Sequence, residues 1–134
     1  MRDLKYLFAY TVPISVYISF ISTGIWTYSA VVYVFLVIPL LDLILGEEKD
    51  NLPDESVASI QNKWIFDVML YLNIPIVFGL LFVAFSSIQT NDFNTLETIG
   101  IAISTGVLLA TNGINVAHEL GHRRTYFARF TSKL

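Results

Sequence analysis

The sequence contains no cysteine, which excludes disulfide bonds and metal sites built from thiolates. It is also poor in charge, because Asp, Glu, Lys and Arg make up only 14% of its 134 residues. A soluble domain has about 25%. Hydrophobic residues make up 54% and the mean hydropathy is +0.62. We therefore predict a protein embedded in lipid, and the lack of interleaved basic and aromatic residues indicates no nucleic-acid partner.

Four apolar stretches are each long enough to cross a bilayer, which takes about 20 residues, with a range of roughly 17–25. They are residues 6–23, 27–45, 65–85 and 98–117. The sequence therefore predicts an all-α integral membrane helix bundle with four transmembrane helices. We expect residues 1–134 to form a single transmembrane domain.

The basic residues predict the orientation of these spans. Lysine and arginine occur before the first span, between the second and the third, and after the fourth. With four spans, all eight basic residues fall on one side of the membrane. The positive-inside rule makes that side cytoplasmic. Both ends of the chain are therefore expected in the cytoplasm.

Histidine is scarce as well, and both histidines lie in one short motif, His118-Glu119-Leu120-Gly121-His122, after the fourth span. Two residues four apart share one face of a helix, so both imidazoles can reach one metal ion. His-Glu-x-x-His is typical of zinc proteases, in which Glu119 would be the general base for water. A purely structural occurrence of the motif is the alternative.

Other polar residues are predicted at a similar depth. Metal-bound imidazoles commonly donate their second N–H to a carboxylate or another acceptor, which orients the ring. The candidates for this supporting role are Asn115, Asp42 and Asp67. Alternatively, the two aspartates reach the interface and stay solvated, and Asn115 forms a hydrogen bond between helices.

Two stripes run along the fourth span when it is drawn as a regular helix with 100° per residue. One consists of small residues, which let helices approach closely in lipid. Its members are Gly106, Ala110, Gly113, Ala117 and Gly121. We expect this stripe to pack against another helix. The second stripe carries polar groups, at Thr111, Asn115, His118 and His122.

Residues 113–123, Gly-Ile-Asn-Val-Ala-His-Glu-Leu-Gly-His-Arg, resemble the first histidine box of the bacterial membrane alkane 1-monooxygenases. These are non-haem di-iron enzymes of the membrane fatty-acid desaturase and hydroxylase superfamily. Arg123 replaces the lysine that is usual there. Residues 39–48, followed by Asn51 and Pro53, are similar to the family's segment after the second span. The resemblance runs from the first span to the end of the chain.

The resemblance implies an enzyme with about six spans, of which this chain would supply the first four. Such an enzyme uses O2 and two non-haem iron ions to hydroxylate the terminal methyl of medium- or long-chain alkanes. His118 and His122 would be iron ligands. Glu119 would support the histidine ligands instead of acting as a general base. The remaining iron ligands are expected beyond Leu134. The chain of 134 residues alone is therefore predicted to be inactive. The alternatives are a membrane-embedded zinc metalloprotease and an inactive membrane fragment.

The same resemblance implies a substrate channel and an electron donor, in the inner membrane of a bacterium. Channel candidates are Ser104, Leu108 and Thr111. The donor would be rubredoxin with its reductase, docking through charge complementarity. The basic candidates for that docking are Arg123, Arg124, Arg129 and Lys133. The positive-inside rule alone would also account for these charges.

Overall fold

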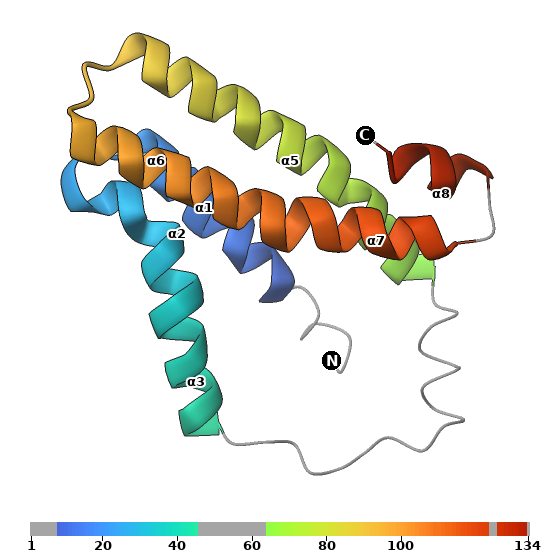
Figure 1. The fold of residues 1–134 in the computed structure, drawn as a ribbon. Helices are drawn as coiled ribbons and strands as arrows, with labels where there is room; N and C mark the ends of the chain where they lie inside the picture. The colour runs from blue at the N-terminus through green and yellow to red at the C-terminus, as the bar shows by residue number, and fades with distance from the viewer. Residues whose placement is uncertain (1–7, 46–63, 124–125, 134) are drawn as a thin grey trace.

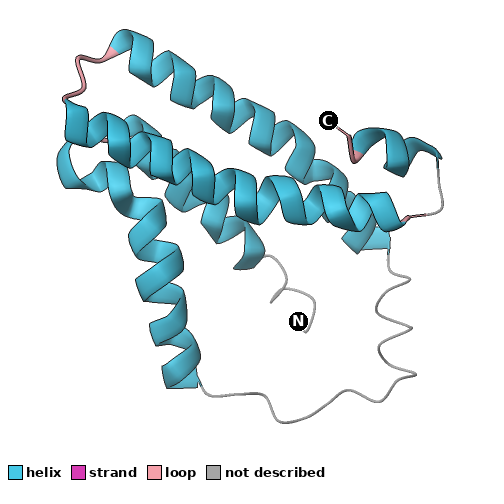
Figure 2. Cartoon of the chain, viewed as in Figure 1, coloured by secondary structure: helices cyan, strands magenta, loops and turns pink. Residues whose placement is uncertain are grey.

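The computed structural model describes residues 8–45, 64–123 and 126–133 (Figure 1). Within these ranges the chain forms helices joined by short loops, with no strand (Figure 2). This confirms the predicted all-α fold. The elements are α1 (Thr11–Ile21), η2 (Gly24–Tyr28), α2 (Ser29–Val32), η3 (Tyr33–Val37), α3 (Ile38–Leu45), α5 (Trp64–Thr90), α6 (Thr95–Leu108), η4 (Leu109–Ile114), α7 (Asn115–His122) and α8 (Tyr126–Thr131). The short η2 is a 3₁₀-helix, whereas η3 and η4 are π-helical.

In the described part of the chain, three continuous helical runs are long and apolar enough to cross a membrane. They are Gly24–Leu45, Phe66–Thr90 and Thr95–His122, of 22, 25 and 28 residues. The first predicted span corresponds to a shorter apolar helix, Phe8–Ile21. That helix ends because Ser22 and Thr23 are extended, and Gly24 then turns the chain with a left-handed φ of 63°.

The long helices form a bundle from which one arm diverges. Helix α5 runs antiparallel to the α6–η4–α7 run, and α1 packs against both α5 and α6 (Figure 1). Their shared core includes Val16, Phe20, Ala84, Ile101 and Leu108. By contrast, α3 has no buried residue and its apolar side chains face outward. Such apolar exposure suits a lipid environment.

The two connections at the left end of the bundle in Figure 1 are tied together. Gly24 donates its backbone N–H to Glu97 Oε1 at 2.6 Å, and the Tyr28 hydroxyl donates to the Leu96 carbonyl at 2.7 Å. These bonds hold the α1–η2 turn against the start of α6. Both turns therefore lie at the same end of the molecule, as alternating spans require.

Helix α6 begins with a capping box. Asn94 Oδ1 accepts from the Glu97 N–H at 3.0 Å, and Glu97 Oε2 accepts from the Asn94 N–H at 2.8 Å. We expect Asn94→Ala to lower the free energy of unfolding by about 1 kcal/mol, because the substitution removes one acceptor for the free N–H groups of the first turn. Equilibrium unfolding followed by circular dichroism would measure the loss. An unchanged transition would contradict the role of this cap.

The packed face of the fourth span differs from the predicted one. A Cβ on Gly106 would have no neighbour within 4 Å, and Ala110 is exposed. Among the described residues, the prediction that this part of the small-residue stripe packs against another helix is therefore wrong. The close contact lies instead at Gly100 and Ser104, where Ser104 Oγ donates to the Thr27 carbonyl at 2.9 Å.

Gly106 lies about 200° around the regular helix α6 from the buried Ser104 and Leu108, so it is on the opposite face, and the helical pitch changes only after Leu108. Buried residues recur at every fourth position through Gly100, Ser104, Leu108 and Asn112, and burial returns at Leu120. An α-helix of 3.6 residues per turn would drift about 40° at each such step. The π-helical η4 contains wider turns and so takes up an extra residue. The buried face therefore continues along positions that a regular helical wheel separates.

Candidate metal site

The two imidazoles of α7 converge. His118 Nε2 and His122 Nε2 lie 3.1 Å apart, with ring centroids separated by 4.5 Å and ring planes at 80°. Bonds from a metal to imidazole nitrogen are about 2.0–2.1 Å long, so both nitrogens can reach one ion. Both side chains are exposed. The donor set thus fits two ligands of a metal ion, and their assignment as iron ligands stays a prediction.

Two of the candidate supporting carboxylates, Asp67 and Glu119, are paired with an arginine. Arg123 Nη1 lies 2.7 Å from Asp67 Oδ1, and Arg123 Nε lies 3.6 Å from Glu119 Oε1. This pairing joins the start of α5 to the end of α7. Because the groups are partly exposed, we expect it to stabilise the fold by at most about 1 kcal/mol. The pairing also engages the side chain of Glu119, which lies on the same turn of α7 as the histidines.

The other two supporting candidates, Asp42 and Asn115, are both exposed. Asp42 is exposed on α3, the arm that leaves the bundle. Asn115 is exposed at the first position of α7. Within residues 8–45, 64–123 and 126–133, no group of three or more His, Asp or Glu is arranged to hold a metal ion. The histidine pair is therefore an incomplete ligand set in the described part of the chain.

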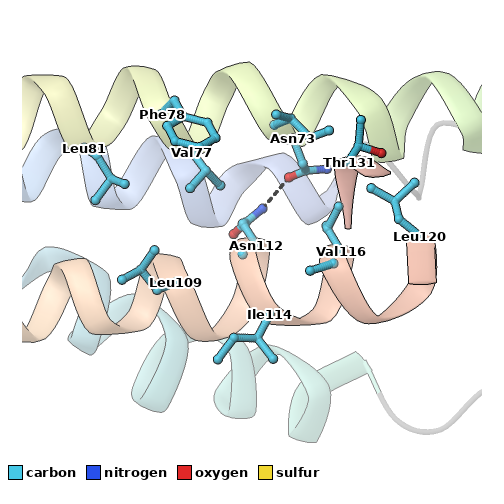
Figure 3. Close-up of a pocket in the computed structure, with 13 residues that line it drawn as sticks. Asn73, Val77, Phe78, Leu81, Leu109, Asn112, Ile114, Val116, Leu120 and Thr131 are labelled. Carbon is cyan, nitrogen blue, oxygen red and sulfur yellow. Dashed lines mark hydrogen bonds between the residues drawn. The ribbon is translucent and has the colours of Figure 1, made fainter. Parts of the chain in front are cut away.

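A pocket of about 380 Å³ lies between α5 and the η4–α7 segment (Figure 3). Its walls are mainly apolar and include Val77, Phe78, Leu109, Val116 and Leu120. Residues two apart on an α-helix point in nearly opposite directions, separated by about 200°. Because Val116 and Leu120 line it, the pocket lies on the side of α7 away from His118 and His122.

None of the predicted channel residues lines this pocket. Ser104 and Leu108 are fully buried on the side of α6 that packs toward α1 and η2. The Thr111 hydroxyl is occupied within its own segment, 2.7 Å from the Val107 carbonyl and 2.9 Å from Asn112 Oδ1. Their role in a channel stays a prediction, and the pocket described here has other walls.

Sequence reasoning missed two polar residues of the pocket wall. Asn112 Nδ2 donates to Asn73 Oδ1 at 2.7 Å across the gap between η4 and α5 (Figure 3). The available signal was that each residue interrupts a long apolar stretch, where an unpaired amide is costly. The separation of 39 positions gave no indication that the two would meet.

The basic residues predicted to dock an electron donor differ in whether their side chains are exposed or already paired. Arg123 is committed to the two carboxylates, and its backbone carbonyl accepts from Arg129 Nε at 3.3 Å. Lys133 is exposed, whereas Arg124 lies outside the described residues. Helix α8 carries Arg129 and returns toward α5, where the rings of Phe127 and Tyr71 pack at a tilt of 44° with centroids 5.4 Å apart. Docking of an electron donor on this surface stays a prediction.

These features define an all-helical membrane protein with a convergent histidine pair at the end of a long apolar helix. Curated relatives give the family. The chain is 30% identical to alkane 1-monooxygenase 1 of Alcanivorax borkumensis, over 83% of this chain and 27% of that protein. It is 33% identical to the alkane 1-monooxygenases of Pseudomonas putida, over 73% and 24%, and of Ectopseudomonas oleovorans, over 72% and 24%.

No protein-family model matches the chain. The chain is nevertheless homologous to the alkane 1-monooxygenases over most of its length, which confirms the predicted resemblance. The match is consistent with the chain being an N-terminal portion of a protein of that family. The chain spans about a quarter of the length of the curated relatives it matches.

Proposed function

We propose that residues 1–134 form one transmembrane domain that contributes ligands to the catalytic centre of an alkane 1-monooxygenase. The observation that carries the proposal is the convergence of His118 Nε2 and His122 Nε2 to 3.1 Å, in a chain homologous to these enzymes. The reaction would convert a terminal methyl, O2, two electrons and two protons to a primary alcohol and water. Substrates would be medium- or long-chain alkanes, entering from the lipid.

In this proposal the chain's own residues hold and orient the centre. His118 and His122 supply two imidazole ligands, a type that suits iron. Bound iron would supply the O2 activation that the reaction requires. The remaining ligands of two iron ions would come from sequence beyond Leu134. Glu119, steadied by Arg123, would orient the histidine-bearing turn instead of acting as a base.

The proposed surroundings follow from topology and charge. Placing both ends of the chain in the cytoplasm of a bacterial cell puts the histidine pair at the inner face of the plasma membrane. Electrons would arrive there from rubredoxin. An acidic carrier of this kind would be attracted by the basic end of the chain, and this attraction would weaken with added salt.

The alternative function is a membrane zinc protease, which would use Glu119 as general base. The relatives are named as monooxygenases and do not favour it. The test is to express the complete reading frame with rubredoxin and its reductase in bacteria that lack alkane oxidation. Gas chromatography would then follow 1-octanol formed from octane. Accumulation of the alcohol would support the proposal, and its absence from a correctly inserted protein would contradict it.

Glu119→Gln separates the two functions. We expect this variant to keep forming alcohol, with a loss of at most about 10–100-fold, the usual cost of removing a residue that only supports a metal ligand. A protease would instead lose its general base and with it peptide cleavage. Assaying the unmodified protein and the variant for both octanol and peptide products decides between them. Peptide cleavage that disappears in Glu119→Gln, without alcohol in either protein, would overturn the hydroxylase.

A further inference from the structure

A hydrogen-bonded chain of amides joins α5 to the π-helical segment η4. Asn73 Nδ2 donates to the Met69 carbonyl at 2.8 Å, and Asn73 Oδ1 accepts from Asn112 Nδ2 at 2.7 Å. Asn112 is only 8% exposed, and it faces α5 within an otherwise apolar wall (Figure 3). Each amide therefore satisfies the other in a place where an unpaired amide would be costly.

The segment that carries Asn112 sets the rotation of the helix that follows. In an uninterrupted α-helix, His118 and His122 would share the face of Ser104, since they follow it by 14 and 18 residues, which is about four and five turns of 3.6 residues. That face is buried in α6. One extra residue rotates everything after it by about 100°. In this structure Leu120 continues the buried face and the two imidazoles turn outward.

We propose that the Asn73–Asn112 hydrogen bond is a positioning device that holds η4 in its π-helical form and thereby aims His118 and His122. The inference rests on the proposed function, in which these histidines are metal ligands. Neither asparagine touches the imidazoles, so both act through the rotation of α7. If η4 relaxed to an α-helix, Asn112 would turn away from α5 and the hydrogen bond between the two amides would break.

The experiment measures the direction of the histidine pair without requiring iron or activity. The chain has no cysteine, so Leu72→Cys, at an exposed position of α5, gives a single site for a nitroxide label. Cu²⁺ added as its iminodiacetate complex would mark the histidine pair in the 134-residue chain, reconstituted in phosphatidylcholine vesicles. Pulsed dipolar electron paramagnetic resonance then gives the copper–nitroxide distance.

We expect Asn112→Leu to shorten this distance. The histidines now lie on the side of α7 away from the pocket and α5, so a rotation of about 100° brings them nearer to α5. With side chains reaching about 5–6 Å from the helix axis, the shift should be on the order of 5 Å. An unchanged distance in the folded variant would overturn the proposal. So would failure of the unmutated chain to bind copper, because the imidazoles would then not converge.

Two further variants separate positioning from simple stabilisation. Asn73→Leu combined with Asn112→Leu leaves no amide unpaired, so the fold should be retained even where the single variant fails. This double variant should show the same shift, whereas a merely stabilising pair would leave the distance unchanged. Thr105→Val is the matched control, because the Thr105 hydroxyl donates only to Ile101 of its own helix at 2.8 Å, and it should cause no shift. Failure to hydroxylate octane would count against the proposed function and would leave the copper distance unaffected.

Discussion

Substituting Gly100 with alanine is expected to destabilise the bundle by about 2–3 kcal/mol, the upper part of the range for overpacking a well-packed site. A Cβ there would lie 2.8 Å from Tyr28 Cε2 and closer still to Thr27 Oγ1. Neither neighbour can retreat freely. Thr27 is fully buried with its hydroxyl bonded to the Gly24 carbonyl at 2.9 Å, and the Tyr28 hydroxyl is bonded to Leu96. Reversible unfolding in mixed detergent micelles would measure the change.

The matched control is Gly106→Ala, one and a half turns further along the same helix. A Cβ there would meet nothing within 4 Å. Alanine is also the better helix former, so this variant should be neutral or more stable by about 0.5–1 kcal/mol. Equal destabilisation by the two variants would contradict the close approach at Gly100, because helix propensity alone acts in the opposite direction.

Removing either imidazole is expected to abolish function without unfolding the chain. In the complete enzyme, His118→Ala should lower iron content and alcohol formation by well over 100-fold, since about 10–100-fold is the cost of losing a residue that only supports a ligand. The free energy of unfolding should change by no more than about 0.5 kcal/mol, because the side chain is exposed. Iron content by mass spectrometry and octanol by gas chromatography would be measured on the same preparations.

The pair should also behave as one unit. His122→Ala should match His118→Ala, and the double variant should be little worse than either single variant, because groups that act together are not additive. Glu119→Gln, on the same turn, is the control with the smaller expected loss. A His118→Ala protein that kept its iron and its activity would remove this pair from the ligand set.

The sequence was sufficient for the class of fold and for the pairing of the histidines. Low charge and long apolar stretches predict membrane helices, and this prediction needs nothing beyond the composition and the length of the stretches. The convergence of His118 and His122 is equally local, because two residues four apart on one α-helix lie together whatever surrounds them. The first inference depends on composition and segment length, and the second depends only on the period of an α-helix over about one turn.

Other features of the site depend on contacts between distant segments. Asp67 pairs with Arg123 and Asn73 with Asn112, from α5 to the run that ends in α7. The prediction of the packed face was wrong at Gly106 because α6 packs through the opposite face, that of Ser104 and Leu108, and only the contacts with η2 and α1 decide this. Beyond Leu108 the π-helical η4 departs from 100° per residue, so a regular wheel no longer gives the face that packs.

The sequence by itself thus determined an all-helical membrane protein with a histidine pair at a helix end, since these follow from hydrophobicity and from spacing within one turn. Only the tertiary structure decided which face of that helix packs, which carboxylates the arginine engages, and where the imidazoles point. The physical reason is that each local change in the number of residues per turn rotates all the side chains that follow it on a long helix. Packing against α1, η2 and α5 decides which of the possible helical pitches forms.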